Sequence, residues 1–440
     1  MVGVNFDESV KYLYSLGNEV EAMKLGLDNV RTLLAALGGP QNKYLKVQVA
    51  GTNGKGSVCA FLDSICVSAG IKTGLYTSPH LISVTERIKI NGVDIEEPAF
   101  AGVATFVRET GELLMERGRL ETVPTYFEQV TAIALIAFAN HGVELAILET
   151  GLGGRFDATT AANADIVAIT RIDLDHQEYL GETLAEIAAE KAAIIHSGSK
   201  VVVAEQKEEA MRVVMLVCAN FGVSPKLAQA VTAVPTGRNT SRSECVAVAF
   251  AFETKQARYE NVCLGLLGQH QIENAKVAIL LAETLREYFK ITIENIIDGL
   301  ENARHPGRLE FIGNFLFDGA HNAAGARALK DFLDEFVDRP ITLIFGSMKD
   351  KDVIDIANVL FPKAETLILT RPENSRAMAV EELSGFVPAE FDKSRVHLTD
   401  TVDEALAQAQ RISKDRLILV TGSLYLVGEA QKILKARSQI

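Results

Sequence analysis

Apolar and polar positions follow two spacings along this chain, and together they predict alternating strands and helices. Short apolar runs bounded by turn residues are typical of buried parallel strands, whereas apolar stripes at helical spacing are typical of amphipathic helices. The runs lie at residues 47–50, 72–76, 144–149, 165–170 and 201–204, and the stripes lie at 58–69, 97–117, 126–140, 183–195 and 207–221. This part of the chain is therefore predicted to form an α/β fold around a parallel sheet.

Turn residues and caps add smaller features. A β-hairpin is expected at residues 87–95, where alternating positions surround Asn91-Gly92. Thr125 is expected to cap the helix that follows it, with Glu128 at capping-box distance. The remaining expectations are two helices within residues 5–38, short strands between 226 and 266, and a long helix from there to about 288.

A second domain is predicted near the C-terminus. The chain has 440 residues, which is too long for one core, and its regular pattern breaks at residues 304–308. We therefore expect two domains, 1–303 and 304–440. Asp318, at the end of the first strand of the second domain, is a candidate for holding a ribose hydroxyl, although the G-x-G-x-x-G motif is missing. This domain is predicted to be a smaller doubly wound α/β domain, with strands at 309–317, 341–345, 366–369 and 417–420 and a helix at 323–337.

A glycine-rich segment between the first strand and its following helix is the main candidate for chemistry. Glycines allow the backbone to approach phosphate oxygens, and N–H groups at a helix N-terminus point at the anion. Lys55 supplies a positive charge and Ser57 supplies a hydroxyl for Mg²⁺. We therefore expect nucleotide binding, and the alternative is an ordinary turn with a solvated lysine. The segment reads Gly51-Thr52-Asn53-Gly54-Lys55-Gly56-Ser57.

Three polar side chains stand at strand ends, where open α/β sheets bind ligands. Ser78 follows the second strand, Glu149 ends the third, and His176 comes soon after the fourth. A hydroxyl, a carboxylate and an imidazole at these places predict a Mg²⁺ site beside the phosphates. The alternatives are a turn serine, a solvent-exposed acid and a structural histidine, and for a lone histidine the structural role is the commoner one. Arg155, in the glycine-rich loop after Glu149, suits an anionic substrate group.

Lys191 stands at a helix position where an apolar residue is expected, on a stripe with Ile187 and Ile194. A buried lysine has its pKa pushed down, so that it can be held neutral or chemically modified. The alternative, which the sequence by itself favours, is a side chain that covers apolar surface with its stem. Its amine would then lie in solvent or pair with Glu186 or Glu190.

Composition narrows the class of protein. The net charge of −13 argues against a nucleic-acid-binding surface. The five cysteines form no C-x-x-C pair, so neither a disulfide framework nor a zinc site is expected, and a reducing cytoplasm fits. A signal-peptide pattern is missing, and the longest apolar run, 132–139, is too short to span a bilayer. We therefore expect a cytoplasmic protein without nucleic-acid or membrane partners.

These motifs together resemble the folylpolyglutamate synthase/dihydrofolate synthase family, a branch of the Mur-type ATP-dependent amide ligases, over nearly the whole chain. The phosphate loop with Gly56 after the lysine, joined to Ser78-Pro79-His80, is specific to this branch. The other matching segments are Leu25-Gly26-Leu27, Glu86 to Gly92, Glu149 to Arg155, Leu174 to His176, Glu190 to Ala192, Gly268 to Gln271 with Asn274, Pro306 to Glu310, Asp318 to Asn322, Asp350 to Asp352 and Thr421 to Tyr425.

The resemblance implies roles for individual residues. The ATP-binding residues that it implies are Asn53, Gly54, Lys55, Gly56, Ser57, Asn274, Arg308 and Asp318, and the Mg²⁺ ligands are Ser57, Ser78, Glu149 and His176. The pterin-binding residues that it implies are Leu25, Gly26, Leu27, Thr125, Gly154, Arg155 and Asp157. The catalytic residues that it implies are Lys55, Lys191 and His321, with Lys191 carbamylated by CO₂ to N6-carboxylysine.

The resemblance also implies a fold and an activity. The fold is a P-loop ATPase-like Mur ligase domain followed by a smaller Rossmann-like α/β domain. The activity is addition of L-glutamate to dihydropteroate, to (tetrahydro)folate polyglutamates, or to both, through an acyl phosphate, with domain closure excluding water. Thr160, Ala193 and Ala323 depart from the residues usual in the family, which are asparagine, glycine and proline. None of these changes removes a proposed catalytic group, and the first bears on pterin affinity.

Two other functions remain open at this point. One is a Mur-type ligase that extends a cell-wall precursor, and the other is a nucleotide-dependent switch that binds ATP without forming an amide. The sequence does not decide whether one or both glutamate-adding activities are present. A monomer is expected.

Overall fold

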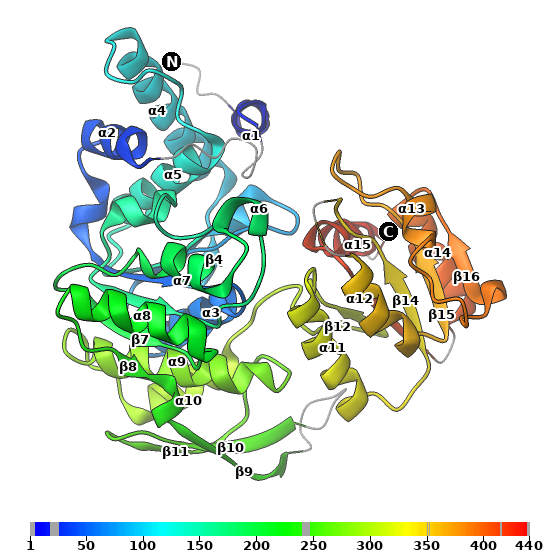
Figure 1. The fold of residues 1–440 in the computed structure, drawn as a ribbon. Helices are drawn as coiled ribbons and strands as arrows, with labels where there is room; N and C mark the ends of the chain where they lie inside the picture. The colour runs from blue at the N-terminus through cyan, green and yellow to red at the C-terminus, as the bar shows by residue number, and fades with distance from the viewer. Residues whose placement is uncertain are drawn as a thin grey trace. The chain divides into compact units, whose positions relative to one another are not determined.

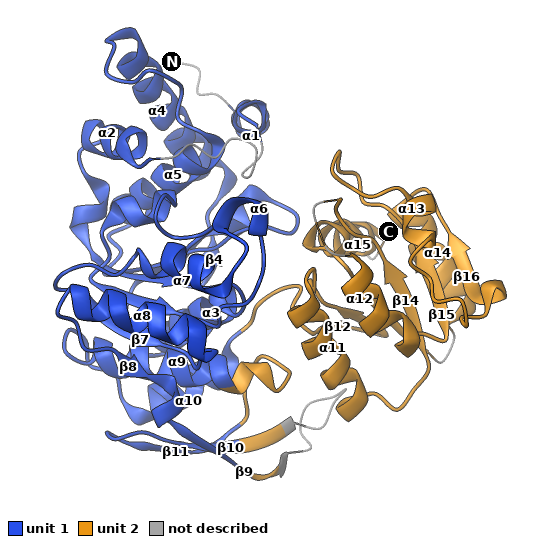
Figure 2. Ribbon diagram, in the orientation of Figure 1, with its two compact units in different colours: residues 1–235, 250–262, 273–303 blue, residues 236–249, 263–272, 304–440 orange. Residues whose placement is uncertain are grey.

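The computed structural model describes residues 5–17, 26–239, 247–349, 351, 353–413 and 416–437, without the side chains of 238, 239 and 247. Leu25, Asp350 and Asp352, which belong to the sequence motifs above, lie outside the described residues. The chain divides into two compact units, drawn in blue and orange in Figure 2. The first unit comprises residues 1–235, 250–262 and 273–303, and the second comprises 236–249, 263–272 and 304–440.

An eight-stranded sheet forms the centre of the first unit (Figure 1), with the order β4-β3-β2-β5-β1-β6-β7-β8. Strand β1 lies between β5 and β6 and runs parallel to both. It is buried from its second residue to its last, which is why its apolar run predicted a central strand correctly. The strands are β1 Leu45–Ala50, β2 Thr73–Tyr76, β3 Ile88–Ile90, β4 Val93–Asp94, β5 Leu145–Glu149, β6 Ile166–Ile169, β7 Lys200–Val203 and β8 Lys226–Leu227. The expected hairpin at Asn91-Gly92 is confirmed as the antiparallel pair β3–β4.

Helices pack around this sheet. Among them, α1, α2, α4 and α5 contact one another and lie together in Figure 1. The expected cap is confirmed, because Thr125 accepts a hydrogen bond from the N–H of Glu128 and returns one to its carboxylate. The helices of this part of the chain are α1 Phe6–Ser15, α2 Asp28–Ala36, α3 Lys55–Ser68, α4 Glu97–Glu116, α5 Tyr126–Asn140, α6 Gln177–Leu180, α7 Leu184–Ala192, α8 Glu208–Asn220, α9 His270–Leu285 and α10 Ile293–Asn302.

Two predicted helix boundaries are wrong. Helix α3 starts at Lys55 rather than at residue 58, because its first turn is polar and glycine-rich and the apolar stripe does not mark it. Helix α7 ends at Ala192 rather than at residue 195. The apolar residues beyond that end, Ile194 and Ile195, are buried in the core without belonging to the helix.

Helix α10, which the predicted elements do not include, packs closely on α3. Gly299 of α10 is the point of nearest approach, since a Cβ atom built there would lie 2.3 Å from the Cα of Ile65. The two backbones are therefore in contact at this glycine. This contact fixes the helix that follows the glycine-rich loop.

Gly299→Ala is expected to destabilise the protein by about 1–3 kcal/mol, because the added methyl group overpacks a backbone contact. Gly102→Ala is the matched control, since nothing lies within 4 Å of a Cβ at that position of α4. Alanine is a better helix former than glycine, so the control is expected to gain about 0.5–1 kcal/mol. Urea unfolding of the two variants measures both effects, and equal midpoints would contradict the close packing of α10 on α3.

A six-stranded sheet forms the second unit, with the order β12-β13-β17-β14-β15-β16 (Figure 1). Strands β13, β17, β14, β15 and β16 run parallel, and helices α11 and α12 contact each other, as do α14 and α15. The strands are β12 Glu310–Ile312, β13 Phe315–Phe317, β14 Ile341–Phe345, β15 Thr366–Leu369, β16 Val396–Leu398 and β17 Leu417–Thr421. The helices are α11 Ala323–Phe336, α12 Val353–Leu360, α13 Val380–Ser384, α14 Val402–Ile412 and α15 Leu424–Arg437. A separate three-stranded sheet joins β9 Thr232–Asn239, β10 Ala247–Glu253 and β11 Arg258–Val262.

The single strand predicted at residues 309–317 is wrong. The chain reverses at Gly313, which has a positive φ of 60°, and forms the antiparallel hairpin β12–β13. Only β13 then joins the parallel strands, by pairing with β17. Among the described residues, no helix combines the length and the apolar character that crossing a membrane requires.

Candidate active site

The glycine-rich loop leaves β1 and turns sharply into α3. Gly51 has room for no side chain, since a Cβ atom there would lie 1.8 Å from Thr170 Oγ1. The N–H groups of Thr52 and Asn53 donate to the carbonyl of Arg171, at 2.9 and 3.2 Å. The loop is therefore held against the segment that follows β6, and glycine at position 51 allows this close approach.

Lys55 lies over this loop. Its Nζ donates to the carbonyl oxygens of Gly51 at 3.1 Å and Thr52 at 3.0 Å. The ammonium group is thus already positioned at the loop where phosphate oxygens are expected. A phosphate bound here would replace these carbonyls as the acceptor of the hydrogen bonds that Lys55 donates.

Asn274 lies against the same loop, at the first turn of α9. A Cβ atom on Gly54, which has a φ of +90°, would lie 2.2 Å from Asn274 Oδ1. This contact joins residues that are far apart in the chain. The structure therefore brings together two of the residues that the family resemblance assigns to ATP.

The candidate Mg²⁺ ligands are centred on Glu149, the last residue of β5. Its carboxylate accepts a hydrogen bond from the N–H of Ser78 at 3.1 Å, and the residue is only 5% exposed. Burial raises the pKa of the Cys59 thiol most, and the negative charge of Glu149 raises it further. Because Cys59 belongs to α3, the carboxylate of Glu149 lies near the first turns of this helix. A buried carboxylate is the kind of hard oxygen donor that Mg²⁺ prefers, so Glu149 fits this ion, and the other ligands stay predictions.

His176 occupies the end of the loop that follows β6. It caps α6 with a left-handed backbone, at a φ of +50°, and its Nε2 lies 3.9 Å from Asp175 Oδ1. That separation is too long for a hydrogen bond. The ligand role of His176 therefore stays a prediction.

Lys191 is buried, and the solvent-exposed alternative for it is wrong. It is 4% exposed, and its Nζ donates to the carbonyl of Gly51 at 2.9 Å. The two glutamates considered as its partners are engaged elsewhere, because Glu190 pairs with Arg155 at 2.8 Å and Glu186 closes the cap of α7.

Two ammonium groups therefore meet at one carbonyl oxygen, that of Gly51, to which both Lys55 and Lys191 donate. Burial, and then the positive charge of Lys55, lower the pKa of Lys191 from 10.5 to about 7. At a pH near this pKa, a large share of the Lys191 amine is neutral. A neutral amine is the form that reacts with CO₂, and the geometry thus suits the modification that the resemblance implies.

The expected pterin-binding residues fall in three places of the first unit. Gly154 and Arg155 follow β5, and the N–H of Arg155 donates to the carbonyl of Glu190 at 3.0 Å. Asp157 is buried, and its carboxylate accepts hydrogen bonds from the loop itself. Thr125 caps α5, while Gly26 and Leu27 precede α2, where Leu27 is buried in the core.

The second unit carries the other expected residues. Asp318 follows β13 and accepts hydrogen bonds from the N–H groups of Leu309, at 3.0 Å, and Ala320, at 2.9 Å. Burial raises the pKa of Asp318, and the positive charge of Arg308 opposes this rise. Arg308 therefore lies close to Asp318. Asp318 thus orders the turn that carries Arg308. His321 Nδ1 lies 2.8 Å from the carbonyl of Gly319, and because a carbonyl oxygen only accepts, Nδ1 is the donor.

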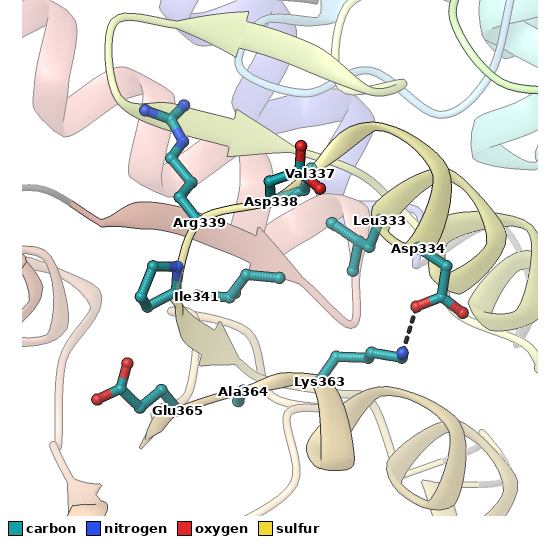
Figure 3. A pocket seen from close by; sticks show the side chains of 10 residues that line it. Leu333, Asp334, Val337, Asp338, Arg339, Ile341, Lys363, Ala364 and Glu365 are labelled. Carbon is teal, nitrogen blue, oxygen red and sulfur yellow. Dashed lines mark ion pairs between the residues drawn. The ribbon is translucent and has the colours of Figure 1, made fainter.

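A hollow of about 490 Å³ lies elsewhere in the second unit (Figure 3). It is formed by the end of α11 and the starts of β14 and β15, and an ion pair between Asp334 and Lys363 lines it. Ligands of open α/β sheets bind beyond the carboxyl ends of the strands, where Asp318 lies. The hollow is at the opposite edge and does not coincide with the predicted site.

Two features of the site escape prediction from the sequence. The carbonyl of Gly51 is a backbone group with no residue signature, although it binds both lysines. Gln48, in the middle of β1, is buried and stands between two valines in the sequence, and this polar residue within an apolar run was the available signal.

Models of known protein families match most of the chain. Residues 49–282 match the Mur ligase middle domain, and residues 307–424 match the Mur ligase glutamate ligase domain. A "probable bifunctional folylpolyglutamate synthase/dihydropteroate synthase" from Halobacterium salinarum is 36% identical over 97% of this chain. The chain spans about half the length of that relative, 51%.

Other relatives match end to end. The dihydrofolate synthase/folylpolyglutamate synthase of Bacillus subtilis is 33% identical, over 94% of this chain and 96% of that protein. The structure of Escherichia coli FolC in complex with DHPP and ADP superposes with a TM-score of 0.84 at 28% identity, and covers 99% of both chains. The expected two-part α/β architecture is confirmed by these matches. This chain belongs to the folylpolyglutamate synthase/dihydrofolate synthase family of the Mur ligases.

Proposed function

We propose that this chain is an ADP-forming acid–amino-acid ligase that joins L-glutamate to the carboxylate of dihydropteroate, of a reduced folate polyglutamate, or of both. One observation carries the proposal. A phosphate loop and a buried lysine meet at the carbonyl of Gly51, in a chain of this family. The names of the relatives, which combine dihydrofolate synthase with folylpolyglutamate synthase, support glutamate as the amine and a pteroate as the acid.

The reaction follows from the charges at the loop. Lys55 and the N-terminal N–H groups of α3 neutralise the phosphates of ATP, so that the substrate carboxylate oxygen can attack the γ-phosphorus. The bond from that phosphorus to the β-phosphate oxygen breaks, and ADP leaves. The glutamate nitrogen then attacks the acyl carbon and loses a proton, and inorganic phosphate leaves.

Mg²⁺ would be held by Ser57, Ser78, Glu149 and His176, where it would supply positive charge to the phosphates. Arg308 and Asp318 are assigned to ATP and His321 to the catalytic step, on the family resemblance. The match of residues 307–424 to a glutamate ligase domain supports a role for the second unit in handling the amino acid.

Lys191 is proposed to react with CO₂. Its neutral nitrogen attacks the carbon and loses a proton, which yields an anionic N6-carboxylysine. The depressed pKa of about 7 and the burial of the amine support this proposal. The added carboxylate would balance the positive charges of Lys55 and of the metal ion.

The proposed function is tested by ADP release from the purified protein with ATP, Mg²⁺ and L-glutamate. Parallel reactions contain dihydropteroate, tetrahydrofolate, a UDP-linked cell-wall precursor, or no acceptor. We expect glutamate-dependent turnover with at least one pterin and none with the UDP-linked compound. Turnover with both pterins establishes a bifunctional enzyme. Tight ATP binding without any turnover would refute the ligase and favour a nucleotide-dependent switch.

We also propose that the protein works as a monomer in the cytoplasm. The four cysteines among the described residues, Cys59, Cys66, Cys218 and Cys263, are all free thiols, which supports a reducing compartment. Light scattering at the assay concentration tests the monomer, and a mass above that of one 47.7 kDa chain would contradict it.

A further inference from the structure

Gln48 is a buried amide in the central strand, between Val47 and Val49, and it is 1% exposed. A buried amide costs free energy unless its polar atoms are hydrogen-bonded. An apolar residue would suit this buried strand position better than glutamine. The hydrogen-bond partners of Gln48 therefore indicate its role.

The side-chain nitrogen of Gln48 meets three threonine hydroxyls. Nε2 lies 2.8 Å from Thr160 Oγ1, 2.9 Å from Thr159 Oγ1 and 3.2 Å from Thr150 Oγ1. An amide nitrogen has two hydrogens, and the two nearer hydroxyls are its best acceptors. These two threonines lie in the short 3-10 helix Ala158–Ala162, beyond the glycine-rich loop that follows β5.

Both of these threonines donate their own hydrogen onward. Thr160 Oγ1 donates to the carbonyl of Gly154 at 2.7 Å, and Thr159 Oγ1 donates to the carboxylate of Asp157. Each hydroxyl has a single hydrogen, so each must accept from Gln48. The direction of every bond in this network is therefore determined, with the amide nitrogen of Gln48 as its source.

The network ends on the loop of residues 151–155. Asp157 accepts hydrogen bonds from the N–H groups of Gly151 and Leu152, both at 2.9 Å. Gly154 lies against the end of α7, since a Cβ atom on it would be 2.6 Å from the carbonyl oxygen of Glu190. The next residue is Lys191, whose amine donates to the carbonyl of Gly51, directly after the end of β1. Contacts therefore connect Gln48 of β1, the loop 151–155 and Lys191.

We propose that Gln48 is a positioning residue, which acts through Thr159 and Thr160 to hold the loop 151–155 in the conformation that binds the pterin acceptor. The inference rests on the proposed function, because the substrate role of the loop belongs to it. Gln48 itself contacts no substrate. Thr160 is its most direct partner, since this one hydroxyl accepts from the amide and donates to the carbonyl of Gly154.

Three variants test the network. Gln48→Met removes both N–H groups at similar length, Thr160→Val removes the hydroxyl at constant shape, and Thr160→Ser keeps the hydroxyl as the matched control. We expect the first two to raise KM for dihydropteroate about fivefold to tenfold, because each removes buried hydrogen bonds that hold the loop, with KM for ATP changed less than about twofold. Thr160→Ser is expected to behave like the wild type.

The double variant Gln48→Met/Thr160→Val is expected to raise KM by less than the product of the two single effects, because the Gln48–Thr160 bond is lost in each single variant and can be lost only once. Amide hydrogen exchange measures the order of the loop independently of catalysis. We expect faster exchange at the N–H groups of Gly151, Leu152 and Arg155 in Gln48→Met than in the wild type. An equal rise in KM for all substrates, additive effects, or unchanged exchange would each overturn the inference. A wild-type protein that turns over no pterin would instead refute the proposed function, while the exchange rates would still decide whether Gln48 orders the loop.

Discussion

Lys191→Ala is expected to lower kcat at least about a hundredfold while the protein stays folded, because the variant removes a charge-bearing group from the phosphate site. The lysine is 4% exposed and bonds to the carbonyl of Gly51, which also binds Lys55. Lys43→Ala, at an exposed position, is the control and is expected to keep wild-type kcat. Steady-state ADP release measures both, and near-normal turnover of Lys191→Ala would refute a catalytic role for this lysine.

The modification itself has a direct signature. In buffer with ¹³C-labelled bicarbonate, the wild type is expected to show a carbamate carbon resonance that Lys191→Ala lacks. The proportion of neutral amine rises as the pH passes the lowered pKa of about 7, so carbamate formation at fixed CO₂ is expected to increase across that range. A carbamate signal that survives the substitution would place the modification on another residue.

Stability supplies an independent check of the burial of Lys191. Its pKa is lowered from 10.5 to about 7 on folding, so between these values the unfolded chain binds more protons than the folded one. The stability of the wild type in CO₂-free buffer therefore rises with pH across this window. Lys191→Met removes the buried ammonium and is expected to raise Tm most at or below pH 7, with a smaller gain toward pH 10.5. A pH-independent difference would contradict the depressed pKa.

Glu149→Gln is expected to lower kcat by about a hundredfold and to raise the Mg²⁺ concentration needed for half-maximal rate, because the variant exchanges a carboxylate ligand for a neutral amide. The glutamine oxygen still accepts the hydrogen bond from the N–H of Ser78, so the local fold is expected to persist. The matched control is Glu144→Gln, an exposed acid just before the other end of the same strand. Loss of activity that excess Mg²⁺ does not affect, together with a lowered Tm, would point to a purely structural role.

Most of the fold was predictable because apolar runs report burial directly. The strand β1 and the cap of α5 followed from local pattern, since each depends on a few neighbouring residues. The start of α3 at Lys55 and the hairpin β12–β13 did not follow, because glycines and polar residues at these turns carry no apolar periodicity.

The candidate site divides in the same way. Lys55 was proposed from the glycine-rich loop and Glu149 from its position at the end of a strand. The burial of Lys191 was only one of two alternatives, since a lysine on an apolar stripe is compatible with either, and its partner is a backbone carbonyl that no sequence pattern marks. The role of Gln48 depends on hydroxyls more than a hundred positions away, at Thr159 and Thr160, and only the three-dimensional structure brings these groups together.

In the proposed reaction, the chain activates a pteroate carboxylate with ATP and passes it to glutamate. The most direct measurement follows ¹⁸O from carboxylate-labelled dihydropteroate, in a reaction with ATP, Mg²⁺ and L-glutamate, by mass spectrometry of both products. We expect a pterin product heavier by one glutamyl residue, and inorganic phosphate that carries one ¹⁸O atom from the substrate. Formation of ADP with neither the glutamyl product nor labelled phosphate would contradict it.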